Sequence, residues 1–236
     1  MAYKLEERLM YELTKGQKTV SVILKIIIIL SAIIGTTLSA MSSAASFMGG
    51  ETVFMYFTIQ SNILIALVCL IGCIIILMNR PCSNVLYVIK LVATVSITLT
   101  GMVFSILLAP SMENAWTLSS ILLHALVPLL SVIDFFVICN VMKVRKINAL
   151  WVTVPPLLYA IYAGVGYIRN WDFSQGRNYP YFFLNWGSEA GAAGFSSNPP
   201  FLGPVWWILI LLAFLIIVGF VYLLIADLIR KKTCPS

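Results

Sequence analysis

The stretch that decides the fold is PVWWILILLAFLIIVGFVYLLIADL, at 204–228, in which Asp227 is the single charged residue. About 20 apolar residues in a helix span the hydrocarbon core of a bilayer, so this stretch predicts a membrane-spanning helix. Further apolar stretches of similar length precede it at 20–42, 54–78, 86–109, 117–142 and 149–168. The sequence therefore predicts an all-α integral membrane protein with six transmembrane helices.

The composition excludes a water-soluble protein. Of the 236 residues, 61% are hydrophobic and 10% are charged, and the mean hydropathy is +0.98. Soluble domains have about 25% charged residues, so too few charges remain here to cover a hydrophobic core. These values exclude a cytosolic enzyme, a nucleic-acid-binding module and a disordered chain. We interpret the net charge of +6 as basic residues that orient a membrane protein, and we expect no nucleic-acid partner.

The basic residues stand mainly in alternate loops between the expected spans. Cytoplasmic loops of membrane proteins carry an excess of Lys and Arg, so this alternation predicts that both termini are cytoplasmic. The long loop at 169–203 is then external. The basic residues that carry this prediction are Lys4, Arg8, Lys15, Lys18, Arg80, Lys143, Arg145, Lys146, Arg230, Lys231 and Lys232.

On this interpretation the chain has three parts. A cytoplasmic lead covers 1–19, the six-helix membrane domain covers 20–228, and a basic cytoplasmic tail covers 229–236. Leucines at helical spacing give the lead one apolar face, which predicts either a helix on the inner membrane surface or an extension of the first span. The compact form favours the plasma membrane of a bacterium.

Two ionisable residues in the expected spans need a partner, because a charge in the membrane interior is costly. Lys90 lies about one turn inside the third span and Asp134 about two turns inside the fourth, both counted from the cytoplasmic side. Given the reach of a lysine, we expect a structural ion pair, with a functional role as the alternative. We also expect the second to fifth helices to enclose a polar interior, with the sixth packed outside them.

A threonine and a histidine lie at matching depth in the outer half of the membrane. At about 1.5 Å per residue, Thr58 lies about 6 Å below the outer end of the second span and His124 about 10 Å below that of the fourth. An imidazole beside a hydroxyl is the minimal arrangement of a nucleophile and its general base. A histidine that only forms a hydrogen bond between helices explains the same pattern.

Three short motifs resemble those of one family of membrane proteins. They are YFTIQSN at 56–62, LHALVP at 123–128 with Asp134-Phe135 after it, and YPYFFLN at 179–185. In this order, and within six spans, they resemble bacterial relatives of the androgen-induced and androgen-dependent TFPI-regulating membrane proteins. The resemblance covers most of the chain.

Animal members of that family are threonine hydrolases that cleave fatty acid esters of hydroxy fatty acids with an intramembrane Thr and His. The resemblance therefore implies that Thr58 is the nucleophile and His124 the general base of a membrane-embedded hydrolase. The expected partner is a membrane lipid or fatty acid ester that reaches the pair from the outer leaflet. An acyl-threonine intermediate would form, and water would resolve it.

Further residues could support such a reaction. Asn62, one turn below Thr58, and Thr98 in the third span are candidate donors to the charge that develops on the ester oxygen, with helix–helix hydrogen bonding as the alternative. Arg169 or Arg177 could hold a lipid carboxylate at the outer interface, or they could be solvated loop charges. We expect no cofactor and no metal, because the chain has a single histidine.

Two functions other than hydrolysis fit the same six helices. A polar interior could pass a small solute, or the protein could bind lipid or a partner without catalysis. The loop at 169–203 is also open to two interpretations. Its aromatic residues could form a lid over the mouth of the bundle, or they could form a belt at the membrane surface.

Overall fold

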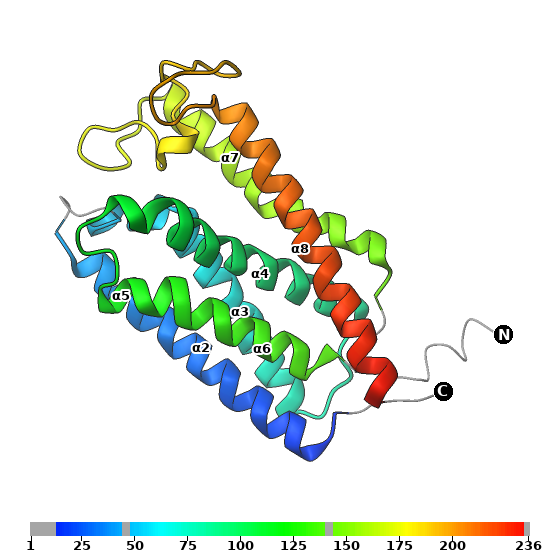
Figure 1. Cartoon of the computed structure of the whole chain (residues 1–236). Helices are drawn as coiled ribbons and strands as arrows, with labels where there is room; N and C mark the ends of the chain where they lie inside the picture. The colour runs from blue at the N-terminus through cyan, green and yellow to red at the C-terminus, as the bar shows by residue number, and fades with distance from the viewer. Residues whose placement is uncertain (1–12, 44–47, 140–143, 234–236) are drawn as a thin grey trace.

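The fold is all-helical, and six helices are long and apolar enough to cross a membrane (Figure 1). The structure is a computed structural model and describes residues 13–43, 48–139 and 144–233. The prediction of an all-α membrane protein with six transmembrane helices is confirmed. The spans are Lys15–Met41, Phe57–Leu77, Asn84–Ser111, Leu118–Val137, Lys146–Ile168 and Pro204–Lys232.

The six spans differ in how regular they are. Three are continuous α-helices, namely α2 (Lys15–Met41), α3 (Phe57–Leu77) and α8 (Pro204–Thr233). The third span is made of α4 (Asn84–Val103), a π-helical turn η2 (Phe104–Leu108) and a 3-10 turn η3 (Ala109–Ser111). The fourth is made of α5 (Leu118–Ile121), a π-helical turn η4 (Leu122–Leu126) and α6 (Val127–Val137). The fifth is made of a 3-10 helix η6 (Lys146–Thr153) and α7 (Val154–Ile168).

Four helices form the body of the protein. Each of α2, α3, α4 and α6 packs against two of the others and together they make a four-helix bundle, in which the span containing α4 is the most buried. Helices α7 and α8 lie to one side of this bundle, and α8 packs against α4 and η6 (Figure 1). We call the end of the molecule that carries residues 169–203 the loop end.

The outward faces of the helices are apolar. Leu30, Leu67, Leu129, Leu158 and Ile217 each expose more than half of their surface. Large apolar side chains exposed in such numbers are unfavourable in water but not against lipid tails. The exposed surface therefore fits a bilayer as the solvent of this protein.

The first span begins at Lys15 rather than at 20, because a capping box starts the helix there. The Thr14 side chain accepts a hydrogen bond from the N–H of Gln17, and the Gln17 side chain accepts one from the N–H of Thr14. Residues 15–19 therefore extend the first span into the predicted lead, and residues 1–12 of the lead lie outside the described residues.

Two other boundaries also differ from the prediction. Helix α3 begins at Phe57 rather than at 54, because Gly50–Met55 forms a separate 3-10 turn (η1). Helix α6 ends at Val137 rather than at 142, and residues 140–143 lie outside the described part of the chain. The first of these differences places Thr58 at the second position of its helix.

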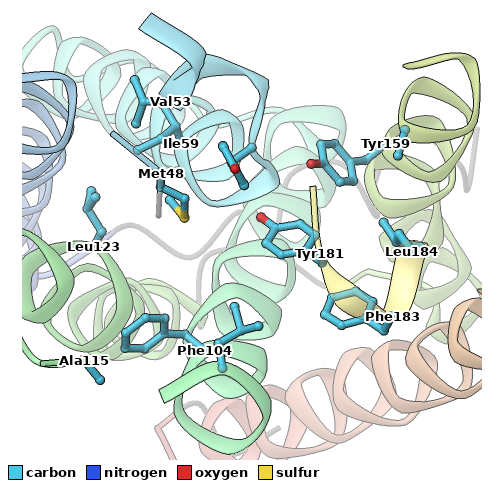
Figure 2. Close-up of a cluster of buried hydrophobic side chains, with 13 residues drawn as sticks. Met48, Val53, Ile59, Phe104, Ala115, Leu123, Tyr159, Tyr181, Phe183 and Leu184 are labelled. Atoms are coloured by element: carbon cyan, nitrogen blue, oxygen red, sulfur yellow. The ribbon is translucent and has the colours of Figure 1, made fainter. Parts of the chain in front are cut away.

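Buried aromatic and aliphatic side chains close the loop end (Figure 2). They include Phe104 of η2, Tyr159 of α7, and Tyr181, Phe183 and Leu184 from the loop between α7 and α8. Figure 2 shows Tyr159, Tyr181 and Phe183 gathered in one space, which they reach from different segments. This part of the loop belongs to the core, which favours the lid over the surface belt for these residues.

Candidate functional site

Thr58 lies where helix α3 starts and where backbone N–H groups have no partner within the helix. Tyr56 is extended and caps the helix, and its carbonyl accepts hydrogen bonds from Ile59 and Gln60. The N–H of Thr58 donates instead to the hydroxyl of Tyr181, at 3.4 Å. The start of α3 is therefore bonded to the loop, and Thr58 is only 4% exposed.

His124 lies in the π-helical turn η4, just before Pro128. Proline has no N–H to donate to the preceding turn, and the winding loosens there. The N–H of Val127 bonds to the carbonyl of Leu122, five residues back. Turns of this kind are rare and often occur at functional sites. The imidazole of His124 is 5% exposed and belongs to the interior of the bundle.

The structure brings Thr58 and His124 together. Thr58 Oγ1 lies 3.4 Å from His124 Nε2, and the other ring nitrogen, Nδ1, lies 3.1 Å from the backbone carbonyl of Ser120. A carbonyl oxygen can only accept, so Nδ1 carries the proton in that hydrogen bond. In a neutral imidazole, Nε2 then presents a lone pair to the Thr58 hydroxyl. A general base needs this orientation.

An aromatic ring holds the imidazole in place. Phe104 stacks on His124 with ring centroids 3.7 Å apart and an angle of 12° between the planes. Trp116 packs edge-on against Phe104, with the ring centroids 5.3 Å apart. Phe104 itself begins the second π-helical turn, η2, so both stacked rings come from loosened turns. The Ser120 carbonyl and the Phe104 face together restrict the ring of His124 to one orientation.

Asn62 connects the backbones that carry the two residues. Its Nδ2 donates to the carbonyl of Thr58 at 2.8 Å and to that of Leu123 at 3.3 Å. In the π register, the Leu123 carbonyl would have bonded to the missing N–H of Pro128, so Asn62 supplies the donor that proline lacks. Both amide hydrogens are used on carbonyls, which makes Asn62 a positioning residue. Its Oδ1 is buried and has no hydrogen-bond partner among the residues that the structure describes.

Two glycines allow the His124 turn to lie close to neighbouring helices. A Cβ atom at Gly101 of α4 would lie 2.8 Å from the carbonyl oxygen of His124. A Cβ atom at Gly35 of α2 would lie 2.7 Å from Leu123 Cγ. Both distances are shorter than real Cβ contacts, so a larger residue at either position would displace η4. The glycines therefore help to set the position of His124.

An apolar pocket lies beside Thr58, at the junction of α3, α4, α7, α8 and the loop. Its hydroxyl groups come from Thr58, Thr100, Tyr159 and Tyr181, and the other lining residues are apolar. The apolar walls include Leu99, Val103, Phe104, Phe183, Ile208 and Leu211. This corrects the sequence prediction in two ways. The space beside Thr58 is mainly apolar, and the first span rather than the fifth completes the four-helix bundle. The sixth span lies to one side of that bundle and contributes Ile208, Leu211 and Leu212 to the pocket.

Thr98 does not lie at this site. Its hydroxyl donates to the carbonyl of Thr94 at 2.8 Å and lies 3.0 Å from the hydroxyl of Tyr222 on α8. Thr98 therefore does not line the pocket, and its contacts fit the alternative of hydrogen bonding between helices. The span containing α4 is buried on several sides, so a polar residue on it can meet α8 as well as α3. The residue of α4 that does line the pocket is Thr100, which hydrogen-bonds with Ser61 of α3 at 2.7 Å.

The two loop arginines also lie away from the pocket. Arg169 caps the end of α7 and Arg177 lies in the following loop, and both are exposed. The Nε of Arg177 donates to the carbonyl of Ser174 at 3.3 Å. Neither arginine lines the pocket, so the structure does not bring them to Thr58. Their exposure fits the alternative of solvated loop charges.

The predicted partners Lys90 and Asp134 are joined by an ion pair of 2.7 Å, and a third residue completes it. Lys25 of α2 bonds to the other oxygen of Asp134 at 2.6 Å, and Ser21 donates to the same carboxylate at 2.7 Å. All four side chains are buried. The sequence analysis missed Lys25, although a lysine inside the apolar stretch 20–42 was a visible signal.

Two tyrosines at the loop end are neutral phenols at ordinary pH. Burial raises the pKa of Tyr56 to about 12, and its hydroxyl donates to the carbonyl of Phe173 at 3.2 Å. Burial also raises the pKa of Tyr181, although hydrogen bonds with Thr58 act in the opposite direction. A phenol that stays protonated can still act as a hydrogen-bond donor. From the sequence, Tyr181 was expected only as one of the aromatic residues of a lid or of a surface belt.

Comparisons with protein-family models, with curated proteins and with solved structures found no match. Within the ranges that the structure describes, no group of three or more His, Cys, Asp or Glu side chains could hold a metal ion. The function is therefore inferred from the contacts around Thr58 and His124.

Proposed function

We propose that this protein is a membrane-embedded lipid-ester hydrolase, with Thr58 as the nucleophile and His124 as its general base. The observation that carries the proposal is the orientation of the imidazole. The Ser120 carbonyl holds the proton on Nδ1, and the Thr58 hydroxyl lies 3.4 Å from Nε2. A catalytic hydrogen bond is often this long before substrate binds.

The reaction follows from this orientation. Thr58 Oγ1 attacks the ester carbonyl carbon while its proton moves to Nε2 of His124. The alcohol then leaves with that proton, and the acyl group stays on Thr58 as an ester. Water attacks this second ester with His124 again as base, which releases the fatty acid and restores the threonine. No cofactor takes part in these steps.

The pocket supports an acyl chain as the part of the substrate that is bound. Twelve of its sixteen lining residues carry no hydroxyl or charged group, so its walls suit a hydrocarbon chain. Thr58 lies in the wall, so an acyl chain in the pocket can present its carbonyl carbon to Oγ1. Fatty acid esters, including the esters of hydroxy fatty acids that the resemblance implies, have this chemistry.

The proposal includes a location for the protein. The distribution of Lys and Arg supports cytoplasmic termini, which would put the loop end and Thr58 in the outer half of the bilayer. The substrate would then come from the outer leaflet of the plasma membrane of a bacterium. Proteolysis of intact cells at the loop 169–203 and at a tag on the C-terminus would test this orientation.

The test of the hydrolase uses purified protein in detergent micelles. Wild type is treated with a fluorophosphonate probe and with p-nitrophenyl esters of graded acyl length, and Thr58→Ala and His124→Ala are compared with it. Mass spectrometry then locates the label. We expect wild type to hydrolyse the esters and to be labelled on Thr58, and we expect both variants to lose turnover by about 10³-fold or more.

Two controls make the result specific. Thr98→Ala removes a membrane hydroxyl that lies outside the pocket, and it should keep the wild-type rate. Thr58→Ser keeps a hydroxyl next to His124 and should keep part of the activity. Equal turnover in wild type, Thr58→Ala and His124→Ala would contradict the proposal. A protein that binds fatty acids but shows no turnover would favour the non-catalytic lipid-binding alternative, and solute uptake into liposomes that survives Thr58→Ala would favour transport.

A further inference from the structure

The proposed reaction needs a donor for the ester oxygen, and the donors expected from the sequence do not supply one. When Thr58 attacks, the carbonyl oxygen becomes an oxyanion, and donors placed in advance stabilise it. Asn62 uses both amide hydrogens on backbone carbonyls. Thr98 bonds to Thr94 and Tyr222 instead. The donor must therefore come from another residue next to Thr58.

Tyr181, in the loop between α7 and α8, contacts Thr58 through its hydroxyl. The hydroxyl of Tyr181 accepts the N–H of Thr58 at 3.4 Å, and it also interacts with the side chains of Thr58 and Tyr159 and with the N–H of Phe57. Tyr181 is 6% exposed and lines the same pocket as Thr58. Thr58 is thus contacted by His124 Nε2 and by the Tyr181 hydroxyl.

We propose that Tyr181 is a further catalytic residue of the proposed hydrolase, and that its hydroxyl and the N–H of Thr58 are the donors that stabilise the oxyanion. The inference rests on the proposed function. The amide lies at the start of α3, where unpaired N–H groups and the helix dipole favour negative charge. An ester oxygen that accepts a hydrogen bond from the Thr58 N–H would also accept one from the Tyr181 hydroxyl.

The ring of Tyr181 is held by its neighbours, so the hydroxyl is placed before substrate binds. It stacks on Phe183 with centroids 5.1 Å apart and an angle of 4°. Tyr56 packs edge-on against it at 5.7 Å, and Tyr159 packs at a tilt of 53° with centroids 6.1 Å apart. Figure 2 shows this grouping of Tyr181 with Tyr159 and Phe183. The phenol is therefore fixed before the reaction, and the Thr58 N–H exchanges its bond to the Tyr181 oxygen for one to the ester oxygen.

The other pocket phenol is less suited to this role. The hydroxyl of Tyr159 donates to the backbone carbonyl of Met55 at 3.1 Å, so its proton is already used. Tyr56 also donates to a carbonyl, that of Phe173, and it does not line the pocket. Tyr56→Phe is therefore a matched control, because it removes a buried hydroxyl from a ring that packs on Tyr181 without touching Thr58.

The experiment compares wild type, Tyr181→Phe, Tyr56→Phe and Thr58→Ala. Phenylalanine at position 181 keeps the ring that stacks on Phe183 and loses only the hydroxyl. We expect Tyr181→Phe to lower kcat for ester hydrolysis by about 10²–10³-fold with little change in KM. Tyr56→Phe should keep the wild-type kcat. An alkyl boronic acid, which forms a tetrahedral adduct on the nucleophile, should bind Tyr181→Phe more weakly by a similar factor.

A second ligand separates catalysis from folding. A fluorescent fatty acid occupies the acyl pocket without forming an oxyanion, so Tyr181→Phe should bind it as wild type does. Turnover and boronate binding at wild-type levels in Tyr181→Phe, with Thr58→Ala inactive, would overturn the role of Tyr181 and leave the hydrolase intact. Equal loss of fatty acid and boronate binding would assign Tyr181 to the structure of the pocket. Turnover that survives Thr58→Ala would instead contradict the hydrolase itself.

Discussion

Two polar layers inside the four-helix bundle are equally buried, yet they differ in charge and in what lies beside them. The site layer, Thr58 and His124, is joined by a hydrogen bond of 3.4 Å, and Thr58 lines an apolar pocket. The ion layer, Lys25, Lys90 and Asp134, is joined by contacts of 2.6 and 2.7 Å, and none of the three lines that pocket. A reaction needs space for a substrate beside the reacting group. We therefore assign catalysis to the site layer, and to the ion layer we assign the role of holding the helices together.

Apolar side chains separate the two layers. Ile65 of α3, Ile97 of α4 and Val127 of α6 are fully buried and belong to one cluster between them. On the fourth span, Val127 lies between His124 and Asp134. Distant residues without shared partners usually act independently, so substitutions in one layer should have little effect on the other. The comparison can therefore be tested by measuring stability and activity separately in variants of each layer.

The largest effect on stability is expected from Asp134→Asn. This change leaves Lys25 and Lys90 buried without their counter-charge, and breaking a buried ion pair in this way costs about 3–5 kcal/mol. The helices α2, α4 and α6, which meet at the carboxylate, should lose their packing. The midpoint of thermal unfolding in detergent micelles measures the effect.

Asp227→Asn is the matched control for this prediction. Asp227 pairs with Arg230 at 2.6 Å near the end of α8, but both side chains are partly exposed. Pairs of this kind contribute about 0–1 kcal/mol. A similar small shift of the unfolding midpoint in Asp134→Asn and Asp227→Asn would show that Asp134 does not hold the ion layer together.

The largest effect on activity alone is expected from Thr58→Val. Valine has nearly the shape of threonine but cannot attack an ester, so turnover should fall by about 10³-fold or more. The cost in stability should stay near 1 kcal/mol, because one hydrogen bond to His124 is lost. Ester hydrolysis and thermal unfolding are measured on the same preparation.

Thr94→Val makes the same substitution near the ion layer. The Thr94 hydroxyl is buried and bonds to no other side chain or backbone group within the described ranges. Thr94→Val should therefore keep the turnover and the stability of wild type. If Thr58→Val unfolded the protein while keeping its specific activity, the roles assigned to the two layers would be reversed.

Much of this arrangement follows from the sequence, because the bilayer imposes simple rules. Spans were found from their length and apolar composition, and the pairing of Thr58 with His124 and of Lys90 with Asp134 followed from depth along a helix. Depth counts residues along a straight axis and needs no knowledge of helix neighbours. These pairs could therefore be predicted with no homologous structure.

The remaining features depend on which helix faces which. Depth alone could not tell that Thr98 contacts Tyr222 of α8 while Thr100 lines the pocket, because the two residues are two positions apart, at nearly the same depth, on a helix that is buried on several sides. The role of Tyr181 depends on how the long loop folds back onto α3. Side-chain spacing within a loop carries no such information, since a loop has no fixed rise or period. The contribution of α8 to the pocket depends in the same way on packing between distant segments.

An intermediate effect is expected from Asn62→Ala, which acts on the position of the site layer. The change leaves the carbonyls of Thr58 and Leu123 without the Asn62 donor, at a cost of about 1–3 kcal/mol. It should also lower kcat, because the turn that carries His124 loses its bond to α3. Ser131→Ala is the control, since the buried Ser131 hydroxyl has no bonded neighbour among the described residues. Equally small changes of stability and kcat in Asn62→Ala and Ser131→Ala would contradict the positioning role of Asn62.

The smallest effect is expected from Lys25→Met, even though Lys25 is as buried as Asp134. The three residues of the ion layer carry a formal charge of +1, so removing Lys25 leaves a neutral pair of Lys90 and Asp134. Methionine is unbranched and can follow the course of the lysine stem past Gly72, where space is tight. Removing one partner of a buried ion pair is costly when it leaves a charge without a partner, and here Asp134 keeps Lys90, so stability should change by about 1 kcal/mol or less in either direction. A loss as large as that in Asp134→Asn would mean that both lysines are needed to hold the carboxylate, and that the ion layer acts as one inseparable unit.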